Sequence, residues 1–107
     1  MTGQYQIKQA DQCLNMADLR AGIDRLDRSL VKLMSERQRY IERAAEIKAH
    51  AAEIRDESRI ADVFAKVTAE AERRGLDVAI ARAVWSTLMD QCIALEMRKF
   101  EKLQRAR

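Results

Sequence analysis

The sequence predicts an all-α fold of three helices, one long, one short and one of medium length, that assembles as a homodimer. The 107-residue chain has no Pro and three Gly, and its aromatic content is 5%, which disfavours β-sandwiches and barrels. Apolar residues recur three and four positions apart, as on the buried face of a helix. One of these stretches predicts a helix so long that the other segments of the chain cannot cover its whole apolar face. The length fits a single domain.

The long stretch covers about residues 15–50 and begins at Asn15, which with Asp18 resembles a helix cap. About 35 residues at about 1.5 Å each make a helix of about 50 Å, longer than a compact domain of this size. We therefore expect the long helices of two copies to pack on each other. The face that would be buried carries apolar residues in alternating steps of three and four: Met16, Leu19, Ile23, Leu26, Leu30 and Leu33.

Two shorter helices are expected after the long one. Asp56 or Ser58 can cap the second, and the sequence Arg73-Arg74-Gly75 is typical of a helix end. Asp77 can cap the third, and Lys99 to Arg107 form a charged tail. The polar segment 1–14 shows no sustained period, so we expect a flexible leader there, followed by one helical domain over residues 15–107.

Composition disfavours several classes of function. The net charge is +3, and the basic residues are interspersed with acidic ones, so the sequence does not predict nucleic-acid binding. Cys13 and Cys92 cannot specify a disulfide framework, and without a signal-like segment they indicate free thiols in a cytoplasmic protein. No stretch approaches the length of about 18 apolar residues that a membrane span needs, so we expect no membrane span.

Two cations lie on the face of the long helix that should be buried. The apolar register continues through Arg37 and Lys48, which are eleven residues apart and so lie on one side of the helix after about three turns. A buried cation without an anion typically costs several kcal/mol. Glu96, four residues after Cys92, shares the apolar face of the third helix and is one candidate partner.

Other kinds of site have little support in the sequence. The single histidine, His50, lies at a helix end without partners for a nucleophilic triad. No His, Cys or acidic residues have metal-ligand spacing, and no Gly-rich phosphate loop occurs. The cations and the acid predict a small anionic ligand inside a helical bundle. A reaction there would depend on positioning and charge complementarity.

A group of residues across the long and second helices resembles the all-helical class of chorismate mutases, over about residues 17–99. The resemblance implies an intertwined helical dimer that converts chorismate to prephenate in aromatic amino-acid biosynthesis, without cofactor or metal. The residues that carry the resemblance are Leu19, Arg20, Ile23, Asp24, Leu26, Asp27, Leu33, Glu36, Arg37, Ile47, Lys48, Arg55, Asp56 and Arg59.

The resemblance also implies roles for individual residues. Arg37 and Lys48 would come from one subunit, and Arg20 would reach in from the other. The two arginines would bind the substrate carboxylates. Lys48 would donate to the ether oxygen, and Glu96 would face that oxygen from the other side. Because a Glu donates a hydrogen bond only when protonated, we expect activity to favour acid pH.

The second and third helices would complete the site. Arg59 would close the pocket near the backbone of Asp56, and Cys92 occupies a position where relatives often carry a hydroxyl. Ile60 stands where many members have an acid that binds the ring hydroxyl, so the sequence departs from the family there. A related branch, isochorismate-pyruvate lyase, acts on a substrate whose hydroxyl sits elsewhere, and the loss of that acid is compatible with either activity.

Each residue also has an explanation without catalysis. Arg20 can be a solvated residue beside the helix seam, and Arg37 and Lys48 can extend their charged ends into water. Glu96 can form a structural ion pair with Lys48. The competing class is a non-enzymatic helical dimer in which these cations are interface residues.

Overall fold

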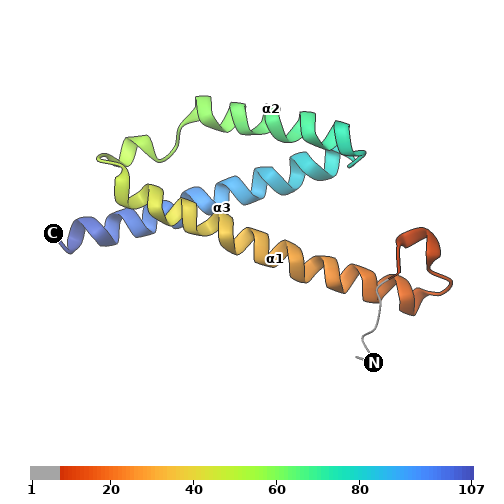
Figure 1. Cartoon of the computed structure of the whole chain (residues 1–107). Helices are drawn as coiled ribbons and strands as arrows, with labels where there is room; N and C mark the ends of the chain where they lie inside the picture. The colour runs from red at the N-terminus through yellow and green to blue at the C-terminus, as the bar shows by residue number, and fades with distance from the viewer. Residues whose placement is uncertain (1–7) are drawn as a thin grey trace. The chain divides into compact units, whose positions relative to one another are not determined.

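The computed structural model describes residues 8–107, and this part of the chain is all-α (Figure 1). The chain divides into two compact units, Met1–Arg37 and Gln38–Arg107, which are described separately. No strand occurs in residues 8–107, so the predicted all-α fold of three helices is confirmed. The homodimer stays a prediction. The helices are α1, Met16–Ile47, α2, Glu57–Arg74, and α3, Val78–Arg105, with single 3₁₀ turns at Ala10–Gln12 and Ala51–Glu53.

Helix α1 begins as the sequence predicted. The backbone N–H of Asp18 donates to the Asn15 side-chain oxygen at 2.9 Å, which satisfies one of the unpaired amides of the first turn. The expected leader lies partly outside the described residues, since 1–7 are not described. In the part that is described, the Lys8 ammonium lies 2.9 Å from an Asp18 carboxylate oxygen.

The apolar stripe in the first unit is largely exposed. Each of its larger side chains keeps about half or more of its surface in water: Met16, Ile23, Leu26, Leu30 and Leu33. Leaving such a contiguous apolar face in water is unfavourable.

Helix α2 starts and ends at the predicted residues. Of the two candidate caps, Asp56 is the one used, and its carboxylate accepts from the Arg59 N–H at 3.1 Å. Gly75 ends the helix with φ 74°, a left-handed conformation that residues other than Gly rarely adopt. In the last turns, hydrogen bonds from Arg73 and then Arg74 lower the pKa of Glu70 from 4.5 to about 2.

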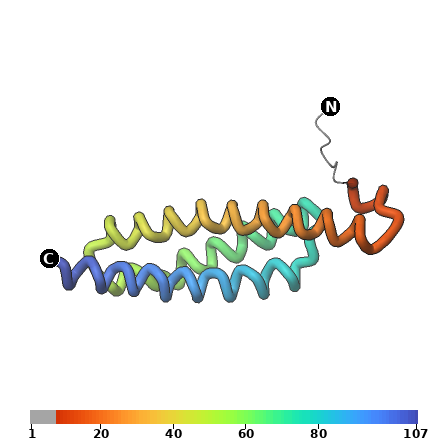
Figure 2. Tube along the Cα trace, turned by 90° about the horizontal axis from the view of Figure 1, so that it is seen from below, coloured from red at the N-terminus to blue at the C-terminus, as the bar shows by residue number. Residues whose placement is uncertain are grey.

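Helix α3 returns antiparallel to α2 after the turn at Gly75 (Figures 1 and 2). Asp77 caps it by accepting from the N–H groups of Ala79 at 2.8 Å and Ile80 at 3.2 Å. The expected charged tail is mostly helical, because α3 continues to Arg105.

The core of the second unit explains this longer helix. Phe100 is buried together with Ala45 from the end of α1 and Ile54 from the α1–α2 connection, and Ile93 and Met97 pack against them. The apolar period of α3 therefore continues past Lys99, which ties the ends of α1 and α3 together.

By length and composition, α3 could cross a membrane, which the sequence analysis did not expect. The core helix of a bundle passes the same test, and a single helix of this kind is weak evidence for a span. That the protein has no membrane partner stays a prediction.

Replacing Phe100 with Ala is expected to lower the free energy of unfolding by about 3 kcal/mol, because it leaves a cavity at a buried aromatic position. Urea denaturation followed by circular dichroism would measure the change. Tyr40→Ala is the matched control, because Tyr40 is 79% exposed, and its effect should stay within about 0.5 kcal/mol. Equal effects of the two substitutions would contradict the assignment of Phe100 to the core.

Candidate active site

Lys48 and Glu96 meet in the second unit. The Lys48 ammonium nitrogen lies 2.6 Å from Glu96 Oε2, and the two side chains are 26% and 5% exposed. Lys48 directly follows α1, and its N–H donates to the Ala44 carbonyl at 3.0 Å, so its backbone continues the helical hydrogen bonding. Glu96 lies on the buried face of α3. Lys48 and Glu96 therefore lie next to each other, as the sequence predicted.

Glu96 Oε2 lies 2.6 Å from the Lys48 ammonium, the separation of a charge-assisted hydrogen bond. An ammonium carries three N–H donors, and the Lys48 side chain is 26% exposed. A polar group of a ligand can therefore reach this ammonium beside the buried carboxylate.

Cys92 lies one helical turn before Glu96 on α3 and is half-buried. It forms no disulfide, in agreement with the expected thiol. It therefore shares the helix region that carries Glu96, as its position in the sequence predicted.

At the start of α2, Arg59 is paired with an acidic residue of its own helix. The guanidinium of Arg59 donates to Asp62 Oδ2 at 2.6 Å, and its side chain is 62% exposed. The Asp56 side chain fixes the Arg59 backbone through the cap described above. Ile60, the departure from the family pattern, is half-buried.

Sequence reasoning missed the partners of Arg59. Asp62 Oδ2 accepts both from Arg59 and from the Lys66 ammonium, the latter at 2.9 Å. These hydrogen bonds, the one from Lys66 first, lower the pKa of Asp62. The spacing of three and four residues along one helix face was the available signal.

Arg20 and Arg37 belong to the first unit. Arg20 is exposed, and Arg37 is half-buried. Arg20 is thus accessible to another molecule.

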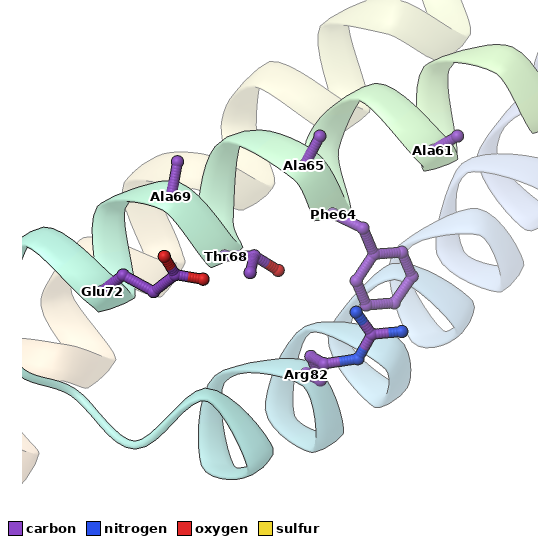
Figure 3. A pocket seen from close by; sticks show the side chains of 7 residues that line it. All are labelled: Ala61, Phe64, Ala65, Thr68, Ala69, Glu72 and Arg82. Atoms are coloured by element: carbon purple, nitrogen blue, oxygen red, sulfur yellow. The ribbon is translucent and has the colours of Figure 1, made fainter.

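A groove of about 520 Å³ lies between α2 and α3, away from the predicted site residues. It is lined mostly by small side chains of α2, with Arg82 of α3 reaching across to the ring of Phe64 at 5.7 Å from its centre (Figure 3). This arrangement is a cation–π contact, and the groove has no buried acid–base pair. The remaining lining residues are Ala61, Ala65, Thr68, Ala69 and Glu72.

Residues 8–107 contain no group of three or more His, Cys, Asp or Glu placed to hold a metal ion. The chemistry available at the Lys48–Glu96 pair is hydrogen bonding and charge stabilisation.

The model of the family described as "Chorismate mutase type II" matches residues 19–97. The chain belongs to this family. The matched range includes all seven residues that the sequence analysis assigned to the site. For a member of the type II chorismate mutase family, the buried ion pair between the end of α1 and α3 is a candidate contact for a chorismate-like substrate.

The chain is also similar to the isochorismate pyruvate lyase of Pseudomonas aeruginosa. The two are 27% identical over 100 residues, which cover 94% of this chain and 99% of the lyase. Together, the family and this relative indicate an enzyme of the chorismate mutase family.

Lys48→Met is expected to destabilise the fold by about 3 kcal/mol, because it strands the Glu96 carboxylate in a buried position. Glu96→Leu in the same chain should recover most of this loss, since no buried charge then lacks its partner. Chemical denaturation of the two single variants and the double variant gives the coupling energy. Additive losses would show that the pair is not formed in solution.

Proposed function

We propose that the protein is a cytoplasmic chorismate mutase, which converts chorismate to prephenate by a Claisen rearrangement in aromatic amino-acid biosynthesis. The observation that carries this proposal is the buried ion pair in which Glu96 Oε2 lies 2.6 Å from the Lys48 ammonium, within the range that matches the family. The reaction breaks the ether carbon–oxygen bond and forms a carbon–carbon bond within one molecule. It needs no redox partner and no cofactor.

In this mechanism the ether oxygen of chorismate enters between Lys48 and Glu96. Negative charge develops on that oxygen as its bond lengthens, and Lys48 stabilises the charge by donating to it. Glu96 can donate from the other side only when it carries a proton. Entry of the ether oxygen between the two groups therefore separates the 2.6 Å pair.

The substrate carboxylates would be bound by arginines. Arg37 of the same chain and Arg20 of the partner subunit would supply planar guanidinium groups that match carboxylate geometry. Arg59, the backbone of Asp56 and the thiol of Cys92 would complete the contacts. Since Arg59 lies on Asp62 in the structure, its side chain must turn to take this role.

The contribution of Arg20 requires a homodimer. The exposed apolar face of α1 supports this assembly, since it needs a partner to leave water. The groove between α2 and α3 offers small side chains that would admit a helix of the second copy.

Glu96→Leu is expected to lower kcat for chorismate by about a hundredfold, because it removes one of the two groups that face the ether oxygen. Glu96→Gln should keep most of the activity, because an amide N–H can donate a hydrogen bond to the same oxygen. Initial rates of prephenate formation by the two variants and the wild type test this expectation. Equal activity of Glu96→Leu and the wild type would remove Glu96 from the mechanism.

Mixed dimers test the sharing of residues between subunits. Arg20→Met and Arg37→Met should each lose most activity as separate proteins. Unfolding and refolding them together should restore about one quarter of wild-type activity, because half of the dimers are then mixed and one of their two sites is intact. Each variant refolded alone is the control. If the mixture recovers no activity, Arg20 and Arg37 do not come to one site from different subunits.

Isochorismate-pyruvate lyase activity is the second candidate. It is favoured by the similarity to the Pseudomonas aeruginosa lyase over almost the whole of both chains. Ile60, which cannot hydrogen-bond a ring hydroxyl, is compatible with it. Assays with isochorismate and with chorismate separate the two candidates. If pyruvate is released from isochorismate with a higher catalytic efficiency than prephenate is formed from chorismate, the protein is a lyase.

A folded dimer that is inactive with both substrates would leave a third reading, a non-enzymatic dimerisation module. That reading also expects Arg37→Met to be tolerated.

A further inference from the structure

We propose that Asp62 and Lys66 are positioning residues that set how readily Arg59 turns to the substrate. Asp62 holds the Arg59 guanidinium while the site is empty, and Lys66 keeps the Asp62 carboxylate paired when Arg59 leaves. The inference rests on the proposed role of Arg59 as a substrate ligand and goes beyond it, because neither Asp62 nor Lys66 touches the substrate.

The geometry makes the two cations compete for one atom. Arg59 Nη1 and Lys66 Nζ both contact Asp62 Oδ2, at 2.6 and 2.9 Å. The three residues lie at steps of three and four on one face of α2. Losing either cation therefore leaves Asp62 with a charged partner.

Only the side chain of Arg59 is free to move. The cap from Asp56 fixes its backbone at the helix start, and the next residue, Ile60, donates its N–H to the Asp56 carbonyl at 2.9 Å. The Arg59 side chain is 62% exposed, and its guanidinium contacts Asp62. A turn about the side-chain bonds can redirect this charge without disturbing the helix.

The ion pair between Arg59 and Asp62 is weak enough to be broken in each catalytic cycle. Exposed ion pairs of this kind change an equilibrium by about two- to fivefold. Some ligands can bind only after Arg59 has left Asp62. The apparent affinity of such a ligand falls as the fraction of molecules with Arg59 released becomes smaller. Lys66 raises that fraction because it shares the same carboxylate oxygen.

Two substitutions should therefore change KM in opposite directions. Asp62→Asn is expected to lower KM for chorismate, or for isochorismate if that is the substrate, by about two- to fivefold, because Arg59 is released. Lys66→Gln is expected to raise KM by a similar factor, because Asp62 then holds Arg59 alone. The value of kcat should stay unchanged in both variants, and their unchanged melting temperatures would show that they are folded.

The Arg59→Met background separates this explanation from a general effect of charge. Removing a negative or a positive charge near an anionic substrate changes KM in the same two directions by long-range electrostatics. If Asp62 and Lys66 act through Arg59, both substitutions lose their effect on KM when Arg59 is Met. Effects that persist in that background would overturn the inference.

A second measurement does not depend on turnover. The Nε–Hε signal of Arg59 in NMR spectra of isotope-labelled protein should shift when chorismate or isochorismate is added. In the Asp62→Asn variant without substrate, it should already have left its wild-type position. A wild-type Arg59 signal that is unmoved by both substrates would overturn the inference even if product forms. Product formation itself decides the proposed function separately.

Discussion

A carboxylate buried on α3 sets the main electrostatic constraint on the second unit. The Glu96 side chain is only 5% exposed, and its charge is tolerable in this buried position because Lys48 comes within 2.6 Å. For Lys48 to reach it, the end of α1 must lie against the second half of α3. The apolar contacts of Ala45 and Phe100 supply that packing. The same cluster that stabilises the unit thus fixes the distance between two groups of opposite charge.

Helix boundaries were predictable because local chemistry determines them. Asn15, Asp56 and Asp77 each satisfy amides of a first turn, and Gly75 takes the left-handed conformation that ends α2. The extent of α3 was misjudged because its last turns are dominated by charged residues. Phe100 continues the apolar period there, and a single buried ring outweighs the polar side chains around it.

The candidate site was predictable to the level of which residues share a face. The register of α1 and the position of Glu96 on α3 anticipated the pair with Lys48. The direction of a flexible side chain does not follow from register, because it depends on which neighbours compete for it. Arg59 illustrates this limit, since Asp62 lies three residues away on its own helix.

The first half of α1 presents its apolar stripe to water, which connects assembly to abundance. Side chains such as Leu26 and Leu30 gain from leaving water only when another molecule covers them. Mass action then makes the covered fraction rise with the concentration of chains. In the proposed dimer, dilution would uncover these helices and open them to proteases. The lifetime of each copy would then depend on the concentration of the protein.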